Sequence, residues 1–219
     1  DEVVVFASGD PLFFGFANTI QREVPDAEII LYPYFNSLQL LAHRLVLPYQ
    51  DMHIVSLTGR PWLKFDQALI EGHHKIGILT DNKEHTPSSI AERMMEYRYD
   101  NYVMHIGELL GNKQKEKVTT LPLTEVIGKT FSFPNNIIIE KNEQRNRPLG
   151  IPDSEFHLLN GRAKMITKMP IRLLSLSVLD LRNRKVFWDV GFCTGSVSVE
   201  AKMQFPHLDI YAFEKREEG

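Results

Sequence analysis

Short apolar runs alternate with amphipathic stretches through the first hundred residues of the chain. Strand-like runs cover residues 3–6, 28–33, 52–57 and 75–80. Stretches with the helical spacing of apolar residues cover 14–22, 37–45, 64–72 and 86–97. Strands that alternate with helices pair in parallel beneath the helices that cover them, so the pattern predicts an α/β fold.

Local signals mark the ends of three of these helices. Ser37 is a suitable N-cap for the second helix, and Gly72 is a suitable stop for the third. Thr86 is a suitable cap for the fourth helix, and Pro87 at its first position already has the φ angle that a helix needs.

The pattern changes in the second hundred residues. Strand-like runs at 101–110, 117–123 and 136–141 follow one another with few helices between them. They predict a mixed or antiparallel sheet, and therefore a second lobe that begins near residues 78–84.

A charged, polar stretch with two prolines, residues 141–152, has the composition of a linker. A helical pattern at 168–179 and a strand at 185–190 follow it. A turn with two glycines, a helix from Ser196 and a strand at 209–213 come next. We therefore expect one domain over 1–144 and another over 145–219.

Composition changes this picture mainly by exclusion. The chain has 219 residues, a net charge of -3 and 43% hydrophobic residues, which is ordinary for a globular protein. We find no basic stripe of the kind that binds nucleic acid and no apolar run of the roughly 20 residues that a membrane helix needs. The one cysteine, Cys193, excludes an internal disulfide and a cysteine-based zinc site. We expect a cytoplasmic protein that binds neither nucleic acid nor membrane.

No metal site is expected either. His73 and His74 are the most suggestive pair of ligands, but adjacent side chains point apart in a strand or a helix. A solvated loop end explains them.

The sequence WDVGFCTGSVSVEA, residues 188–201, has the order of a nucleoside-binding corner. A strand ends at Asp189, Gly191 and Gly195 flank a turn, and a helix follows whose backbone amides can bind an anionic group. Glu214, at the end of the next strand, can accept hydrogen bonds from both hydroxyls of a ribose. The loop fits the form D-x-G-x-G-x-G, with Cys193 at the central glycine. The alternative is a purely structural corner with an exposed Glu214.

The sequence ASGDPLFFG, residues 7–15, places a Gly-Asp-Pro turn after the first strand-like run. Ligands of open α/β sheets bind at the carboxyl ends of strands. Asp10 could therefore hold an amino group or a ribose of a ligand, or it could cap the next helix. The sequence leaves both roles open.

Five stretches together resemble, in family order, the tetrapyrrole (class III) methyltransferases. They are ASGDPLFFG, YPYFNSLQLLAHRL, VSLTGRP, ILTDNKEHTPSSIAERM and VMHIGELLGNKQKEKV. Residues 150–181 and the glycine turn resemble the start of a class I methyltransferase that methylates C15 of a corrin precursor and removes a carboxylate. The resemblance implies two α/β lobes followed by the first part of a Rossmann-like domain.

The same resemblance implies S-adenosylmethionine as methyl donor and a precorrin or cobalt-precorrin tetrapyrrole as acceptor in cobalamin biosynthesis. It implies donor contacts in the first domain at Gly9, Asp10, Phe13, Ser37, Leu38, Leu79, Gly107 and Pro134. It implies donor contacts in the second domain at Thr167, Asp189, Gly191, Gly195 and Glu214. It also implies a homodimer.

The chemistry requires little beyond alignment and the exclusion of water, because the donor sulfonium is already a strong methylating agent. No catalytic residue is assigned. Arg60 and Lys64 are candidates for holding the acidic side chains of a tetrapyrrole, and a solvated surface is the alternative for each.

The chain departs from the family patterns at both ends. We expect the first domain to lack its N-terminal strand and loop, and the second to hold only its first part. Two other functions stay open. One is a class III methylase that acts on another tetrapyrrole or on a protein, and the other is a non-catalytic donor-binding or scaffold module.

Overall fold

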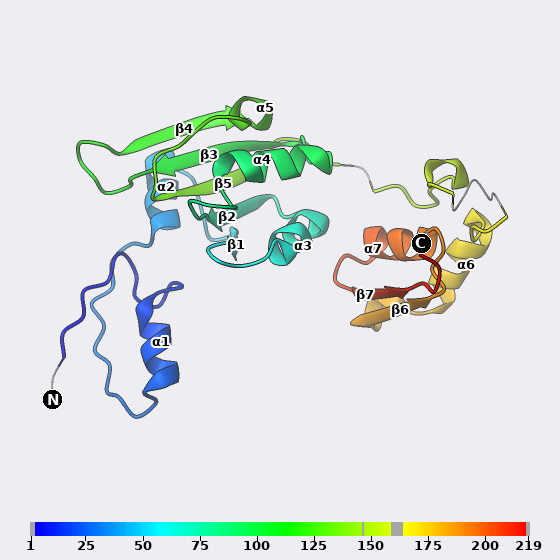
Figure 1. Ribbon diagram of the computed structural model, residues 1–219, viewed down its shortest axis with the longest axis horizontal. Coiled ribbons are helices and arrows are strands. Elements are labelled where there is room, and N and C mark those ends of the chain that lie inside the picture. The colour runs from blue at the N-terminus through cyan, green and yellow to red at the C-terminus, as the bar shows by residue number, and fades with distance from the viewer. Residues whose placement is uncertain (1–2, 146, 159–163, 218–219) are drawn as a thin grey trace. The chain divides into compact units, whose positions relative to one another are not determined.

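The structure is a computed structural model that describes residues 3–145, 147–158 and 164–217. The chain divides into two compact units, residues 1–144 and residues 145–219 (Figure 1). Each unit is described by itself.

The first unit contains a five-stranded sheet in the order β1-β2-β5-β3-β4. The strands are β1 (His53–Ser56), β2 (Lys75–Leu79), β3 (Tyr102–Glu108), β4 (Lys117–Pro122) and β5 (Asn135–Lys141). β1 and β2 are parallel, and every other pair is antiparallel. A mixed sheet was predicted, but the lobe boundary near residues 78–84 is wrong. β5 pairs with both β2 and β3, so strands from the two sides of that boundary share one sheet.

Helices cover both faces of this sheet. They are α2 (Ser37–Leu45), α3 (Leu63–Glu71), α4 (Pro87–Glu96) and α5 (Leu123–Val126). The first helix, α1 (Phe16–Glu23), has one buried residue, Ala17, and contributes to neither of the two clusters on the sheet. The buried side chains of α3, α4 and α5 pack in one cluster with Ile137 and Ile139 of β5. Those of α2 pack in a second cluster with Ile138. Successive side chains of a strand point to opposite faces, so these two clusters lie on the two sides of the sheet.

The helix ends follow the local signals, with one shift. Thr86 caps α4 with Pro87 in its first turn, and Gly72 ends α3 at φ 75°, as predicted. The cap of α2 is Asn36 rather than Ser37, which is the first helical residue. The Asn36 side chain accepts from the Gln39 amide at 2.9 Å, and the Gln39 side chain accepts from the Asn36 amide at 3.0 Å. Because of this reciprocal capping box, the helix begins one residue earlier than a cap at Ser37 would place it.

Two predicted strands are wrong. Residues 3–6 and 28–33 have no strand conformation in the structure, and their large apolar side chains are mostly exposed. A strand needs a neighbour for its backbone N–H and C=O groups. β1 and β4 are the two edges of the described sheet, and neither run pairs with them.

The second unit has the predicted order of strand, turn, helix and strand. It contains α6 (Met169–Val178), β6 (Val186–Val190), α7 (Ser196–Gln204) and β7 (Asp209–Phe213), with short 3-10 turns η1 (Asp153–Glu155) and η3 (Leu181–Asn183). β6 and β7 are parallel. A small core of Leu176, Leu181, Ala201 and Leu208 joins the helices to the strands. Among the described residues, no helix is both long and apolar enough to cross a membrane.

Asp81 organises the loop between β2 and α4. Its carboxylate accepts from the backbone amides of Lys83, Glu84 and His85 at 2.9 Å each, and its Oδ2 lies 2.6 Å from Nδ1 of the buried His85 ring. Burial disfavours the carboxylate, but the His85 ring and these amides outweigh it and hold the pKa of Asp81 far below its usual value.

Replacing Asp81 with asparagine tests this loop. The folded-state pKa is lowered, so the ionised group stabilises the protein above its unfolded pKa, near 3.8, and this contribution is lost as the pH falls. We expect Asp81→Asn to lower the free energy of unfolding by about 1–3 kcal/mol at pH 7. The difference from the wild type should shrink at pH 3. Urea denaturation at both pH values measures it, with the exposed Asp26→Asn as control. An equal difference at the two pH values would contradict the assignment.

Candidate functional site

The Gly-Asp-Pro loop of the first unit lies against the start of α2. A Cβ atom at Gly9, whose φ is 71°, would lie 3.4 Å from the Phe35 carbonyl oxygen and 3.6 Å from the Cα of Asn36. These are ordinary van der Waals distances, so it is the left-handed backbone, and not the approach, that favours glycine here. The loop and the N-terminus of α2, which begins at Ser37, therefore meet as two walls of one corner.

Asp10 has a local role in this loop. Its Oδ1 accepts from the Leu12 amide at 2.9 Å, and its carbonyl accepts from the Phe13 amide at 3.1 Å. The carboxylate therefore shapes the turn. It does not cap the next helix, the structural role that the sequence left open, because the N-cap of α1 is Gly15 and no side chain caps that helix. For its second oxygen, Oδ2, the structure records no hydrogen bond with any of the described residues.

Three residues predicted to contact the donor meet in the α2 cluster. Leu38 is fully buried there, and Phe13 and Leu79 pack against the same cluster from the loop and from the end of β2. Three separate parts of the sequence thus converge on one apolar surface.

Gly107 lies near the C-terminal end of β3, and Pro134 immediately precedes β5. These two ends are adjacent, because β3 and β5 are antiparallel. Gly107 pairs with Asn136 across the two strands, and the Leu109 amide donates to the Pro134 carbonyl at 2.9 Å. A Cβ atom at Gly107 would lie 2.8 Å from Leu110 Cδ1 and 3.0 Å from Asn136 Oδ1. The glycine therefore keeps this corner free of a side chain.

Two polar residues beside Gly107 were not predicted. Asn136 is 2% exposed, and neither polar atom of its side chain has a hydrogen-bond partner among the described residues. Glu108 is also buried. Its Oε1 accepts from the Ser132 amide at 2.7 Å, but its Oε2 has no hydrogen bond and lies 3.8 Å from Lys117 Nζ. A buried polar group without a partner is costly, so these atoms are candidates for contact with a ligand. The sequence signal that could have identified Asn136 is its amide side chain immediately before the apolar run of β5, residues 137–139.

The two basic candidates differ in their surroundings. The Arg60 guanidinium lies over the Phe14 ring, 5.0 Å from its centroid, and therefore beside the Gly-Asp-Pro loop. Lys64 is exposed in the first turn of α3.

The glycine turn of the second unit is closed by Glu214. Its Oε2 accepts from the Cys193 amide at 3.0 Å, and its Oε1 accepts from the amides of Lys215 at 2.9 Å and Arg216 at 3.1 Å. The Glu214 side chain is 4% exposed, so it is not the exposed carboxylate of the alternative reading. The Arg216 amide, with the Cys193 amide and the Arg216 guanidinium, holds the pKa of Glu214 below its usual value against the effect of burial.

The turn itself has left-handed backbone at three positions. Gly191 has φ 79°, Gly195 has φ 67° and Cys193 has φ 52°. Gly195 precedes the first residue of α7, and no side chain caps that helix. Asp189 accepts from the Ser198 hydroxyl at 2.6 Å, so its carboxylate braces α7 against the end of β6.

Thr167 lies in the segment that runs beside this turn. The Cys193 thiol donates to the Met165 carbonyl at 2.8 Å, which holds the segment against the turn. The Thr167 side chain is exposed, and its carbonyl accepts from Arg172 at 2.8 Å. The candidate residues of this unit therefore lie near the N-terminal end of α7. They are Thr167, Asp189, Gly191, Gly195 and Glu214.

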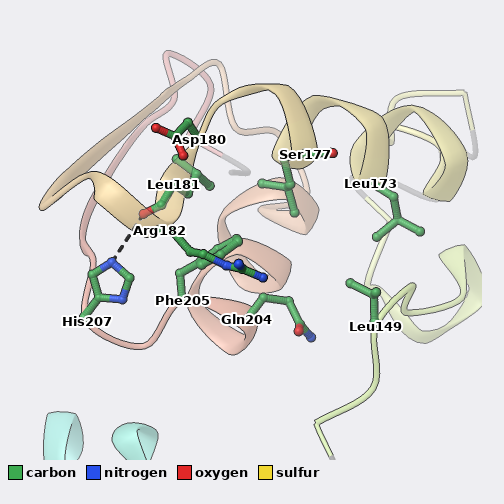
Figure 2. A pocket seen from close by; sticks show the side chains of 10 residues that line it. Leu149, Leu173, Ser177, Asp180, Leu181, Arg182, Gln204, Phe205 and His207 are labelled. Carbon is green, nitrogen blue, oxygen red and sulfur yellow. Dashed lines mark hydrogen bonds between the residues drawn. The ribbon is translucent and has the colours of Figure 1, made fainter.

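A cavity of about 680 Å³ lies elsewhere in the second unit, at the C-terminal ends of α6 and α7. Figure 2 shows Leu173, Arg182, Gln204 and His207 around it, with His207 Nε2 3.3 Å from the Leu181 carbonyl. None of the predicted site residues lines it.

Comparison with known proteins identifies the chain. Residues 1–127 match the sequence profile of the tetrapyrrole (corrin/porphyrin) methylases. The chain belongs to the tetrapyrrole methylase family. Residues 160–219 match a second profile, that of the precorrin methyltransferase domain. The predicted family and its α/β fold class are therefore confirmed.

Three relatives of this tetrapyrrole methylase match different shares of it. The precorrin-6Y C(5,15)-methyltransferase [decarboxylating] of Sinorhizobium sp is 29% identical over 97% of the chain and 51% of the relative. The cobalt-precorrin-7 C(5)-methyltransferase of Salmonella typhimurium is 29% identical over 57% of the chain and 59% of the relative. The cobalt-precorrin-6B C(15)-methyltransferase (decarboxylating) of the same organism is 46% identical over 26% of the chain and 30% of the relative. The chain spans about half the length of the first of these.

Among the described residues, no group of histidine, cysteine and acidic side chains could hold a metal ion. The adjacent histidines have different partners. His73 Nε2 lies 2.8 Å from Glu71 and its ring stacks on His53, whereas His74 Nε2 lies 3.6 Å from Glu140.

Two adjacent asparagines of β5 provide a matched test of the buried polar site. Asn136 has no partner, whereas Asn135 accepts from the Thr80 hydroxyl at 2.8 Å and donates to the Ser132 carbonyl at 3.0 Å. We expect Asn136→Leu to raise the free energy of unfolding by about 1–3 kcal/mol, because it removes unpaired buried polar atoms. Asn135→Leu should lower it, because the Ser132 carbonyl loses the donor that the Asn135 side chain supplies, whereas the Thr80 hydroxyl keeps its bond to the Asn135 carbonyl at 2.6 Å. Urea denaturation of the two variants measures both effects. A loss of stability in Asn136→Leu would mean that its polar atoms are satisfied in solution.

Proposed function

We propose that this chain carries the donor-binding parts of an enzyme that methylates C5 and C15 of a precorrin and removes a carboxylate, as part of cobalamin biosynthesis. One observation carries the proposal. A tetrapyrrole methylase match and a precorrin methyltransferase match follow one another in the same chain. The Sinorhizobium relative, named for both positions, matches across both. S-adenosylmethionine is the proposed donor.

In the first unit the residues proposed to hold the donor are those gathered around the α2 cluster and Gly107. They are Gly9, Asp10, Phe13, Ser37, Leu38, Leu79, Gly107 and Pro134. The fit is supported by the unpartnered atoms of Asn136 and Glu108, which a polar ligand could satisfy. It is also supported by the absence of a side chain at Gly107, where a Cβ atom would lie too close to Leu110 and Asn136.

In the second unit the proposed contacts are Thr167, Asp189, Gly191, Gly195 and Glu214. The uncapped N-terminus of α7 suits an anionic group of the ligand. Glu214 suits ribose hydroxyls, but it already accepts three backbone hydrogen bonds. Ligand binding there would therefore share or exchange these bonds.

The bound donor supplies an electrophilic methyl group. The chain's own residues orient it and exclude water, through the apolar side chains of Phe13 and Leu79, which pack against the buried Leu38 in the first unit. Arg60, beside the Gly-Asp-Pro loop, and Lys64 are the proposed partners for carboxylates of the acceptor. No side chain is assigned to proton transfer.

Calorimetric titration of S-adenosylhomocysteine into the full chain tests the proposal. We expect two binding sites in the wild type. Asp10→Ala should weaken the site of the first unit by about tenfold or more, because a charge-assisted hydrogen bond is worth about 1.5–3 kcal/mol. Asp10→Asn retains the acceptor for the Leu12 amide and so separates loss of the turn from loss of the charge. Asp26→Ala, an exposed aspartate, is the control.

Each outcome has a defined meaning. Loss of one site in Asp10→Ala and weakening in Asp10→Asn would support a donor contact of the carboxylate. Loss of binding in Asp10→Ala, with wild-type binding in Asp10→Asn, would mean that Asp10 only shapes the turn and does not contact the donor. Absence of binding in the wild type would overturn the proposed donor sites.

A further inference from the structure

The second unit contains an ion pair that is shielded completely from water. Arg172 of α6 and Glu200 of α7 are both fully buried, and Arg172 Nε donates to Glu200 Oε2 at 2.6 Å. The removal of two charges from water is expensive unless geometry and further hydrogen bonds compensate. An apolar pair of similar volume can be as stable as a buried ion pair when no other group depends on the two charges. These charges also hydrogen-bond four backbone groups, so a role in ligand binding has to be tested separately from their role in stability.

The further hydrogen bonds that the structure records for the pair are with residues that precede α6 in the sequence. Arg172 donates to the Thr167 carbonyl at 2.8 Å, to Asp153 Oδ1 at 3.3 Å and to the Ile151 carbonyl. Glu200 Oε1 accepts from the amides of Gly150 and Ile151.

Asp153 extends the network to the start of α6. Its Oδ1 accepts from the Met169 amide at 3.0 Å, two residues after Thr167. The Arg172 guanidinium also lies over the Phe156 ring, 4.9 Å from its centroid. Each N–H-bearing side of the guanidinium therefore faces an acceptor, and the plane of the group is covered.

The two ends of this network are the two walls of the proposed donor site. Glu200 is in α7, which begins immediately after Gly195. Thr167 is in the segment that the Cys193 thiol holds through Met165. Arg172 is the residue that joins them, because it contacts Glu200 and the Thr167 carbonyl at the same time.

We infer that Arg172 and Glu200 are positioning residues for the donor site of the second unit, and that they set the place of Thr167 relative to the glycine turn. The inference rests on the proposed function of that site. Neither side chain reaches the ligand, since both are fully buried. They act through the Thr167 backbone and through α7.

Trp188 provides a readout of this unit alone. The chain has two tryptophans, and Trp62 belongs to the first unit. Trp188 precedes Asp189 in β6 and is largely exposed. In a Trp62→Phe background, a fluorescence titration with S-adenosylhomocysteine reports the second site.

The decisive variant is the double replacement Arg172→Met/Glu200→Met, which removes both charges together. The double variant also removes the partner of four backbone groups, so we expect it to melt below the wild type. A purely structural pair predicts unchanged affinity at a temperature at which the variant is still folded. We expect instead that the affinity at that temperature falls about tenfold. Arg184→Met, at an exposed arginine of the same unit, should leave both unchanged.

Arg172→Lys gives an independent test if the double variant melts early. Lysine keeps the charge opposite Glu200, but its single ammonium cannot replace a planar group that contacts Glu200, Thr167 and Ile151 together. We expect a similar loss of affinity in this variant. Wild-type affinity in a folded variant would overturn the inference and leave the donor site in place. A wild-type chain whose Trp188 fluorescence shows no binding would overturn the donor site and the inference with it.

Discussion

The first unit depends on the burial of β5 on both faces. Ile137 and Ile139 pack under α3, α4 and α5, while Ile138 between them packs under α2. β5 is also the strand that joins the parallel pair, β1 and β2, to the antiparallel pair, β3 and β4. A slip of one residue would exchange the two sets of side chains, so this strand fixes the register of the sheet and the seat of every covering helix.

The same register places the candidate site. Asn136 is two residues before Ile138 and points to the α2 face, opposite Gly107 of β3. Leu79 ends β2 on that face, and Leu38 of α2 covers it. The candidate site therefore lies where the ends of β2 and β3 and the start of β5 meet α2. Loops from distant parts of the chain add the remaining walls.

The sequence predicted the elements whose signals are local, and it failed where a distant partner decides. Thr86, Pro87 and Gly72 mark helix ends through contacts within a few residues, so α3 and α4 were predictable. Residues 3–6 and 28–33 have strand composition, but composition cannot supply a neighbouring strand. Asn136 was missed for a related reason. It was predicted as the first residue of a strand, and only the packing of α2 over the sheet shows that its side chain is buried. The positions of the candidate donor residues came from family resemblance, and their roles stay predictions.

Buried polar groups mark both candidate sites, but in opposite ways. In the first unit, Asn136 and one oxygen of Glu108 are buried without partners, which destabilises the chain by itself. In the second unit, Arg172 and Glu200 are buried with hydrogen bonds on every side, so they need nothing from a ligand. Unsatisfied atoms are suited to contact with a ligand, because binding then recovers the cost of their burial. Satisfied charges are suited to holding other groups in place, because their geometry is already fixed. The same costly feature, a buried polar group, therefore has opposite consequences in the two units.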